Sequence, residues 1–198
     1  MKENLGRRTL LSLTIRSYFI RLFYNYFNLF GEGLCVCLVP FTNEDKDNFL
    51  KQNLKFFNTN EYLSGFSLGI ILRSRDEKPE NLEKAKDILS SVAGSVGDRL
   101  LYKLILPVIV LTSLNLFAVS GFVLTKEAVI IVLSEIVIFN IFSFMLRYYG
   151  IKNGYEKGLE SIRIFRTAAY LKAVSVFTYV RNILILILIV NLFILLFN

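Results

Sequence analysis

The sequence predicts an all-α integral membrane protein with about three to four membrane-spanning helices, re-entrant or interfacial segments, and cytoplasmic amphipathic helices. Apolar residues make up 54% of the 198 residues, and the mean hydropathy is +0.52, so the chain is more apolar than an ordinary soluble domain. The apolar residues gather in long runs that carry almost no charge, as crossing a bilayer requires. Basic residues flank these runs, which is typical of membrane helices.

Three segments carry the membrane prediction. Residues 104–124 contain no charged residue over 21 positions, and residues 128–146 contain one over 19 positions; each is long enough to span. Residues 183–197 are intensely apolar but only 15 residues long. A helix extended back to about Ala173 would span, and it would hold Arg181, whose long side chain can reach the interface by snorkelling.

The N-terminal part, residues 1–103, is predicted to lie at or beside the membrane. Residues 17–41 are apolar and aromatic but are interrupted by polar side chains, and residues 62–72 are too short to span. Both are expected to be re-entrant or interfacial and buried against other protein, because irregular backbone cannot face lipid. A plain spanning helix over 22–41 is the alternative for the first of them.

Two charged stretches in the same part, 42–60 and 73–90, are predicted to form solvated cytoplasmic helices. Pro79 stands at a plausible start of the second helix, because proline is favoured in the first turn.

The distribution of charge predicts the topology. Residues 147–182 carry seven Lys or Arg against two Glu, a net charge of +5. The positive-inside rule therefore places 1–103, with the N-terminus, and a basic loop at 147–182 in the cytoplasm. We expect one membrane domain over 1–198, with 104–198 as its membrane-spanning part. A basic excess that flanks apolar runs does not indicate a nucleic-acid partner.

The residue types present exclude several kinds of chemistry. The chain has no histidine, so it lacks the usual general base, the commonest metal ligand and any phosphohistidine. Cys35 and Cys37 alone make a poor zinc site and are interpreted as apolar fillers. The glycine-containing run 93–98 lacks the Lys-Ser/Thr of a phosphate loop, and a sharp turn or a close helix contact is the better interpretation. We therefore predict no catalytic residue, no metal and no cofactor.

Two features inside or beside the spans are candidates for function. Glu135 is the charge deepest in a predicted span, where an ionised carboxylate costs about 2.5–3.5 kcal/mol, so it should face protein or water. It could handle a substrate or an ion, or it could be a structural ion pair or a protonated carboxyl. The aromatic and basic block that begins at Arg147 has the composition of an interface anchor.

Four short blocks stand in a characteristic order along the chain. They are Arg16-Ser17 with Asn25-Tyr26, Gly33 and Val39-Pro40; Leu54-Lys55-Phe56-Phe57-Asn58-Thr59; Gly94-Ser95-Val96-Gly97-Asp98 followed by Pro107; and Arg147-Tyr148-Tyr149-Gly150 with Gly154-Tyr155 and Gly158. In this order and spacing, over residues 16–158, they resemble the IID membrane subunits of mannose/fructose/sorbose-family sugar phosphotransferase systems.

The resemblance implies a function and a set of partners. A IID subunit acts with a IIC membrane subunit to carry a hexose across the bacterial inner (cell) membrane, in a complex expected to be a homo-oligomer. Separate soluble IIA and IIB components phosphorylate the sugar, so a chain without histidine fits a non-catalytic subunit. The motif positions implied to face the substrate or the partner are Asn25, Tyr26, Gly94, Gly97, Asp98, Arg147, Tyr148, Tyr149, Gly150, Gly154, Tyr155 and Gly158.

The sequence also departs from the family pattern. Phe27-Asn28 stands where the family has Glu-Arg, Phe30 replaces a glutamine, and Tyr102 replaces a tryptophan. The sequence also stops after one further predicted span, where the family normally continues. We therefore expect a shortened, divergent IID subunit. The alternative is a non-transporting membrane regulator or docking protein derived from the same family.

Overall fold

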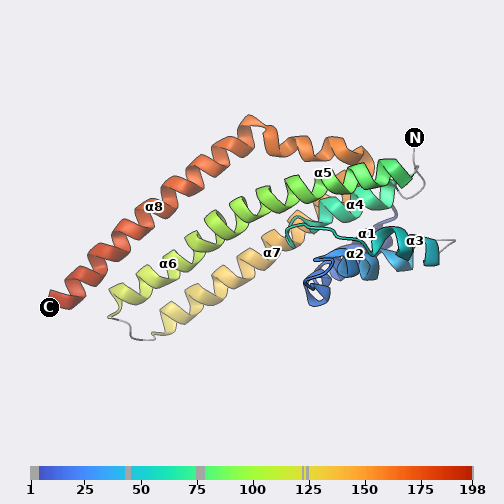
Figure 1. The fold of residues 1–198 in the computed structure, drawn as a ribbon. Helices are drawn as coiled ribbons and strands as arrows, with labels where there is room; N and C mark the ends of the chain where they lie inside the picture. The colour runs from blue at the N-terminus through green and yellow to red at the C-terminus, as the bar shows by residue number, and fades with distance from the viewer. Residues whose placement is uncertain (1–4, 43–45, 75–78, 122, 124, 198) are drawn as a thin grey trace. The chain divides into compact units, whose positions relative to one another are not determined.

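The computed structural model describes residues 5–42, 46–74, 79–121, 123 and 125–197, and most of them are helical (Figure 1). Within these ranges, extended pairing is limited to two isolated bridges, so the predicted all-α class is confirmed. The α-helices are α1 Arg7–Ser17, α2 Gly31–Leu38, α3 Lys46–Asn53, α4 Ser64–Ser74, α5 Pro79–Gly97, α6 Leu106–Val119, α7 Lys126–Lys157 and α8 Ala168–Phe197. Four other helical segments are η1 Ile20–Phe23, η2 Val39–Phe41 and η4 Gly158–Arg166, which are 3-10 helices, and η3 Asp98–Ile105, a π-helix.

The chain divides into two compact units. The first unit holds the described residues of 1–97 and 143–164, and the second unit holds those of 98–142 and 165–198. The chain passes from one unit to the other within helical segments. One membrane domain over 1–198 stays a prediction.

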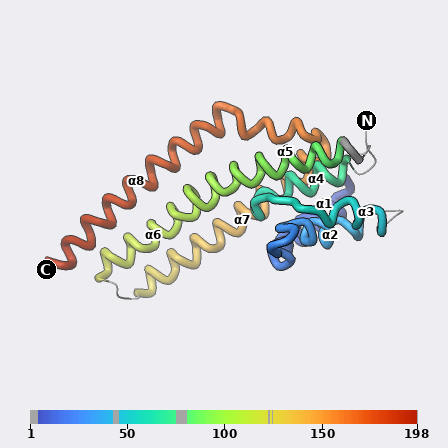
Figure 2. The backbone as a smooth tube through the Cα atoms, in the orientation of Figure 1, coloured from blue at the N-terminus to red at the C-terminus, as the bar shows by residue number. Residues whose placement is uncertain are grey.

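Among the residues that the structure describes, three helical runs are long and apolar enough to cross a membrane. They are Asn81–Val119, Lys126–Arg166 and Ala168–Phe197, with 39, 41 and 30 residues, and Figure 2 shows their extended courses. About 20 residues span the hydrocarbon core, so each run extends beyond it. The first run joins the predicted cytoplasmic helix of 73–90 to the predicted span of 104–124.

Two predicted boundaries are corrected. The basic segment 147–182 is not a loop: α7 continues to Lys157 and α8 begins at Ala168. The helix continues through Gly150 and Gly154, which pack against α4, and it ends at Gly158, whose φ of +59° suits a residue without Cβ. The first apolar helix ends at Val119 rather than at 124, because a turn with Gly121 at φ +63° follows it.

The spanning helix considered as an alternative for 22–41 is wrong. The segment breaks into η1, a tight turn, α2 and η2. Leu29 in that turn has φ +52°, and Pro40 lies in the first turn of η2, so neither site continues an α-helix.

The first unit has an apolar interior built around α4. Every residue of α4 except Arg73 is buried, which confirms that the segment 62–72 is buried against protein. Glycines make this possible: a Cβ at Gly65 or Gly69 would overlap the backbone of Arg147 or Ile151 on α7. Small residues let two helix backbones approach this closely.

The facing helix contributes the reciprocal pair of glycines. A Cβ at Gly150 would lie 2.9 Å from the backbone nitrogen of Phe66, and one at Gly154 would lie 2.7 Å from its carbonyl oxygen. The helix α5 covers a further side of α4 and is amphipathic, with Leu82, Ala85, Leu89 and Ala93 buried. The helix predicted over 73–90 is therefore confirmed from Pro79 onward. Of the helix predicted over 42–60, α3 forms only Lys46–Asn53, and the buried residues that follow it are not helical.

The second unit joins α6, α7 and α8 by a few polar contacts among largely exposed apolar side chains. Asn115 on α6 donates to the carbonyl oxygen of Leu184 on α8 at 3.0 Å and accepts from Asn191 at 3.2 Å. Ser113 on α6 donates to the carboxylate of Glu135 on α7.

Arg181, which was expected inside the last span, has a specific partner. Its guanidinium donates to the carbonyl oxygen of Lys103 at 3.0 Å. Lys103 lies in the π-helix η3, so this bond joins η3 to α8.

Candidate functional site

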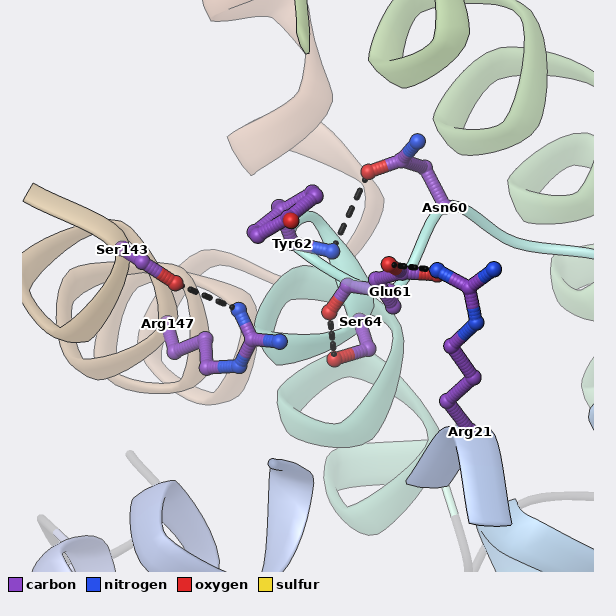
Figure 3. Close-up of polar contacts among 7 residues, drawn as sticks. All are labelled: Arg21, Asn60, Glu61, Tyr62, Ser64, Ser143 and Arg147. Atoms are coloured by element: carbon purple, nitrogen blue, oxygen red, sulfur yellow. Dashed lines mark hydrogen bonds and ion pairs between the residues drawn. The ribbon is translucent and has the colours of Figure 1, made fainter. Parts of the chain in front are cut away.

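The candidate site is built around an irregular segment of the first unit, residues 58–63, which we call the polar loop. It connects the end of α3 to the start of α4 and is labelled in part in Figure 3. Loops normally keep polar groups in water, but here Thr59, Asn60 and Glu61 are 3%, 2% and 7% exposed. Polar groups buried to this extent are retained only where they find hydrogen-bond partners.

The loop satisfies many of these groups locally. The Asn60 side-chain oxygen accepts the Tyr62 N–H at 3.1 Å, and the Ser64 hydroxyl donates to the Glu61 carbonyl at 2.6 Å. The hydroxyls of Thr59 and Ser67 lie 3.2 Å apart. The result is a fixed, pre-organised backbone turn at the start of α4.

The loop carries one buried carboxylate. Glu61 pairs with the guanidinium of Arg21 at 2.6 Å, and the exposed fraction of the side chain is 9% for Glu61 but 65% for Arg21. Burial raises the pKa of the neighbouring Tyr62 hydroxyl, the Glu61 carboxylate raises it further, and Arg147 and Arg21 act in the opposite direction. Tyr62 therefore stays a neutral hydroxyl at physiological pH.

Arg147 places a buried cation beside the loop. It is only 3% exposed, and it donates to the Ser143 hydroxyl one turn earlier on α7 at 2.9 Å (Figure 3). Its guanidinium carbon lies 4.4 Å from the ring centroid of Tyr18 and 5.1 Å from that of Tyr62. Cation–π contact with two rings stabilises a charge that has left water. Arg147 is thus buried inside the first unit, and its position at the membrane interface, facing the partner, stays a prediction.

The glycine segment packs against the same loop. Gly94 and Gly97 lie within α5, so of the two interpretations the sharp turn is wrong and the close contact is confirmed. A Cβ at Gly97 would overlap the side chain of Asn60, and one at Gly94 would lie 3.2 Å from the Asn58 amide nitrogen. The Asn58 N–H donates to the Ser90 hydroxyl of α5 at 3.2 Å.

Asn25 and Tyr26 lie in the turn that precedes α2. The Asn25 side-chain oxygen accepts the N–H groups of Phe27 and Asn28 at 2.9 and 3.0 Å, while Tyr26 is 90% exposed. Backbone bonds join this turn to the start of the polar loop, since Phe30 N–H donates to the Phe57 carbonyl at 2.9 Å. The turn therefore positions the start of the loop through its backbone.

The remaining motif residues of α7 have separate environments. Tyr148 stacks on Phe144 and, with Arg7 and Lys152 among the neighbours, lines a cavity of about 290 Å³. Tyr149 is half exposed. Arg73 donates to the Tyr155 carbonyl at 2.8 Å, and Gly158 ends the helix.

Asp98 and Glu135 belong to the second unit. Asp98 is exposed at the start of η3, and Glu135 accepts from Ser113. The first unit therefore gathers Gly94, Gly97, Arg147, Gly150 and Gly154 around the loop and α4, and it does not include these two acidic residues.

Sequence reasoning missed five residues of this arrangement: Arg21, Glu61, Gly65, Gly69 and Ser143. The spacing Gly65-x-x-x-Gly69 matches that of Gly150-x-x-x-Gly154, and that signal is visible in the sequence. The Arg21–Glu61 pair joins residues 40 apart, and nothing local in the sequence indicates it.

The fold and the site together define a multi-span helical membrane protein with a buried, hydrogen-bonded loop. A profile of the family described as "PTS system mannose/fructose/sorbose family IID component" matches residues 4–195. The chain belongs to this IID family.

Named relatives support the assignment. The chain is 22% identical over 176 residues to the "PTS system mannose-specific EIID component" of Escherichia coli (strain K12), covering 82% of this chain and 60% of that protein. It is 23% identical over 175 residues to the "Fructose permease IID component" of Bacillus subtilis (strain 168), covering 82% and 61%. The chain thus spans about three fifths of the length of these curated relatives.

Solved structures share the fold. One is the cryo-EM structure of the mannose transporter ManYZ with microcin E492, with a TM-score of 0.65, 20% identity, and coverage of 93% of this chain and 70% of that one. Another, described as "Structure of membrane protein", has a TM-score of 0.73 and 18% identity, with coverage of 92% and 70%.

Proposed function

We propose that the chain is the IID subunit of a sugar permease, in which it acts with a IIC membrane subunit to translocate a hexose that soluble IIA and IIB components phosphorylate. The observation that carries the proposal is the polar loop. The Asn60 amide and the Glu61 carboxylate of the loop are buried and already paired, the carboxylate with the guanidinium of Arg21. The loop therefore supports the proposal as a fixed structural element beside α4 and α7. Its neighbours hold the loop rigidly. A surface that positions a partner subunit or a substrate needs such support.

The first test is uptake of a labelled hexose by cells that carry the IIC partner with or without this chain. We expect uptake to depend on the chain, and equal uptake in both cells would contradict the proposal. If the chain co-purifies with the IIC subunit but uptake is unchanged, the non-transporting docking protein is the correct interpretation.

The second test uses two matched Glu→Gln changes. Glu61→Gln removes the buried charge of the polar loop, whereas Glu83→Gln removes the charge of an exposed pair with Lys55 on the same unit. We expect Glu61→Gln to lower uptake at least about tenfold, because misplaced positioning groups cost that much or more. Glu83→Gln should leave uptake unchanged. If the two changes affect uptake equally, the polar loop has no specific role in transport.

The third test addresses the orientation, with the N-terminus in the cytoplasm. Cys35 and Cys37 are buried, and burial raises their pKa values to about 11 and about 12, so at neutral pH both remain protonated and poorly reactive. Because the two native cysteines react poorly, an introduced cysteine can be detected. We expect Tyr148→Cys to react with a thiol reagent only from the cytoplasmic side. Lys126→Cys should react only from the outside, and the reverse pattern would overturn the topology.

A further inference from the structure

A cavity in the second unit is not used by the proposed transport function. It measures about 430 Å³, opens widely to the surface, and lies between η3 and the first half of α8. Six of the residues that line it are Arg99, Leu171, Val174, Ser175, Thr178 and Asn182. A cation, hydroxyls and an amide thus share one cavity with apolar side chains.

The cavity lies where the membrane-spanning helices become polar. Beyond it, residues 104–119 of one helical run and 183–197 of α8 carry no charge. The two runs are parallel neighbours, since Arg181 contacts Lys103 and Asn115 contacts Leu184 further along. Their cationic ends therefore meet at the same level, the depth of lipid headgroups.

The charge of this region favours an anion. The segments 98–105 and 168–182 carry four cations, Arg99, Lys103, Lys172 and Arg181, against one acidic residue, Asp98, for a net charge of +3. Basic pockets between membrane helices at this level bind anionic lipid headgroups. An Arg guanidinium suits the phosphate group, because its N–H donors can bond two oxygens at once.

The polar side chains are oriented for a phosphate ester rather than for a simple cation. Arg181 donates to the side-chain oxygen of Asn182 at 3.0 Å, so the Asn182 amide keeps its N–H donors for a ligand. The Thr178 hydroxyl donates to the Val174 carbonyl at 2.7 Å, and its oxygen can still accept from a headgroup hydroxyl. Leu171 and Val174 supply apolar contact that a free phosphate ion would not use.

We propose that this cavity binds the phosphodiester headgroup of an anionic phospholipid, with phosphate at Arg99 and the glycerol and upper acyl carbons against Leu171 and Val174. The bound lipid bridges η3 and α8.

The test measures thermal stability of the full chain in a neutral detergent. Dioleoyl phosphatidylglycerol should raise the melting temperature in a saturable way, whereas dioleoyl phosphatidylcholine should not. Inorganic phosphate and glycerol phosphate, added without lipid, test whether a soluble phosphate compound binds instead of a lipid headgroup. If either of them stabilises the chain as well as the lipid does, a soluble ligand replaces the lipid and the proposal is overturned.

Variants then locate the site. Arg99→Gln should weaken the response to phosphatidylglycerol at least about tenfold, as the loss of a charge-assisted bidentate contact predicts. Arg163→Gln removes the same charge from an exposed side chain of the first unit and should change nothing. Ser175→Leu keeps every charge but fills the cavity, and it should also abolish the response. An unchanged response in both Arg99→Gln and Ser175→Leu would place the lipid elsewhere and refute the site.

Discussion

The two units of the chain place their large apolar side chains differently: the first unit buries them, and the second unit exposes them. In the first unit, large apolar residues such as Leu13, Leu34 and Phe57 are fully buried. In the second, Ile138 and Leu186 are more than 60% exposed, and none of the most apolar window of α8 is buried. The exposed apolar surface of the second unit is what a lipid solvent accepts.

The reversal implies two different sources of stability. The first unit gains from removing apolar area from water, at about 25 cal/mol per Å², and from backbone contact across glycines. Between helices in lipid that driving force is absent, so the second unit depends on hydrogen bonds such as those of Asn115. Substitutions that disturb packing in the first unit should therefore cause the largest losses of stability. Substitutions that remove a polar contact in the second unit should cause only small losses.

The largest expected effect is a glycine substitution in the first unit. Gly69→Leu forces a side chain into the backbone of Ile151 and Tyr155, and we expect a loss of at least about 3 kcal/mol, the upper range for overpacking. Gly6→Ala is the matched control, because its nearest neighbour is an ordinary contact 3.9 Å away. Thermal unfolding in detergent measures both, and similar stabilities would refute the close crossing of α4 and α7.

The next effect concerns the buried cation. Arg147→Gln removes contact with the rings of Tyr18 and Tyr62, and we expect a loss of about 2 kcal/mol, as for a desolvated cation–π contact. Arg163→Gln, at a side chain 78% exposed, should leave stability unchanged. Thermal unfolding in detergent measures both variants, and equal stability of the two would contradict the burial of Arg147.

The sequence predicts the second unit better than the first. Uncharged runs reveal spanning helices because lipid excludes charge along the whole length, and three such runs were predicted near their observed places. The ends were predicted less well: the helix α7 continues through Arg147 to Lys157, because this part packs against α4 across Gly150 and Gly154.

The first unit depends on contacts between residues that are distant in the chain. The pairing of Arg21 with Glu61 and the packing of Gly97 on Asn60 set the polar loop, and neither follows from local periodicity. Motif resemblance identified Gly97 and Arg147 as positions of interest, yet it gave no indication that Arg147 is buried. The block that begins at Arg147 has basic residues beside aromatic ones, which is also the composition of an anchor at the membrane interface.

A smaller effect tests the polar contacts of the second unit. Asn115→Leu removes the bonds to Leu184 and Asn191, and interhelical hydrogen bonds in membranes are worth about 0.6 kcal/mol on average and at most about 1.7 kcal/mol. Thr112→Val is the control, because the Thr112 hydroxyl donates to the Val108 carbonyl of its own helix at 2.9 Å. Detergent-induced unfolding should separate the two variants, and a loss above about 3 kcal/mol for Asn115→Leu would show that the second unit is stabilised like the first.

The last effect is absent at neutral pH and is a dependence on alkaline pH that belongs to the first unit, which holds both cysteines. Burial raises the pKa of Cys35 to about 11 and that of Cys37 to about 12, with Arg16 and Arg147 opposing the shift at Cys37. The folded state therefore keeps the thiol protons between about pH 9 and these values, where the unfolded chain has lost them, so this contribution to stability is complete below pH 9 and declines as the pH rises. Replacing both cysteines by alanine should make the melting temperature fall less steeply between about pH 8 and pH 10.5 than it does in the unchanged chain. Parallel slopes for the two proteins would show that the thiols do not leave water when the first unit folds.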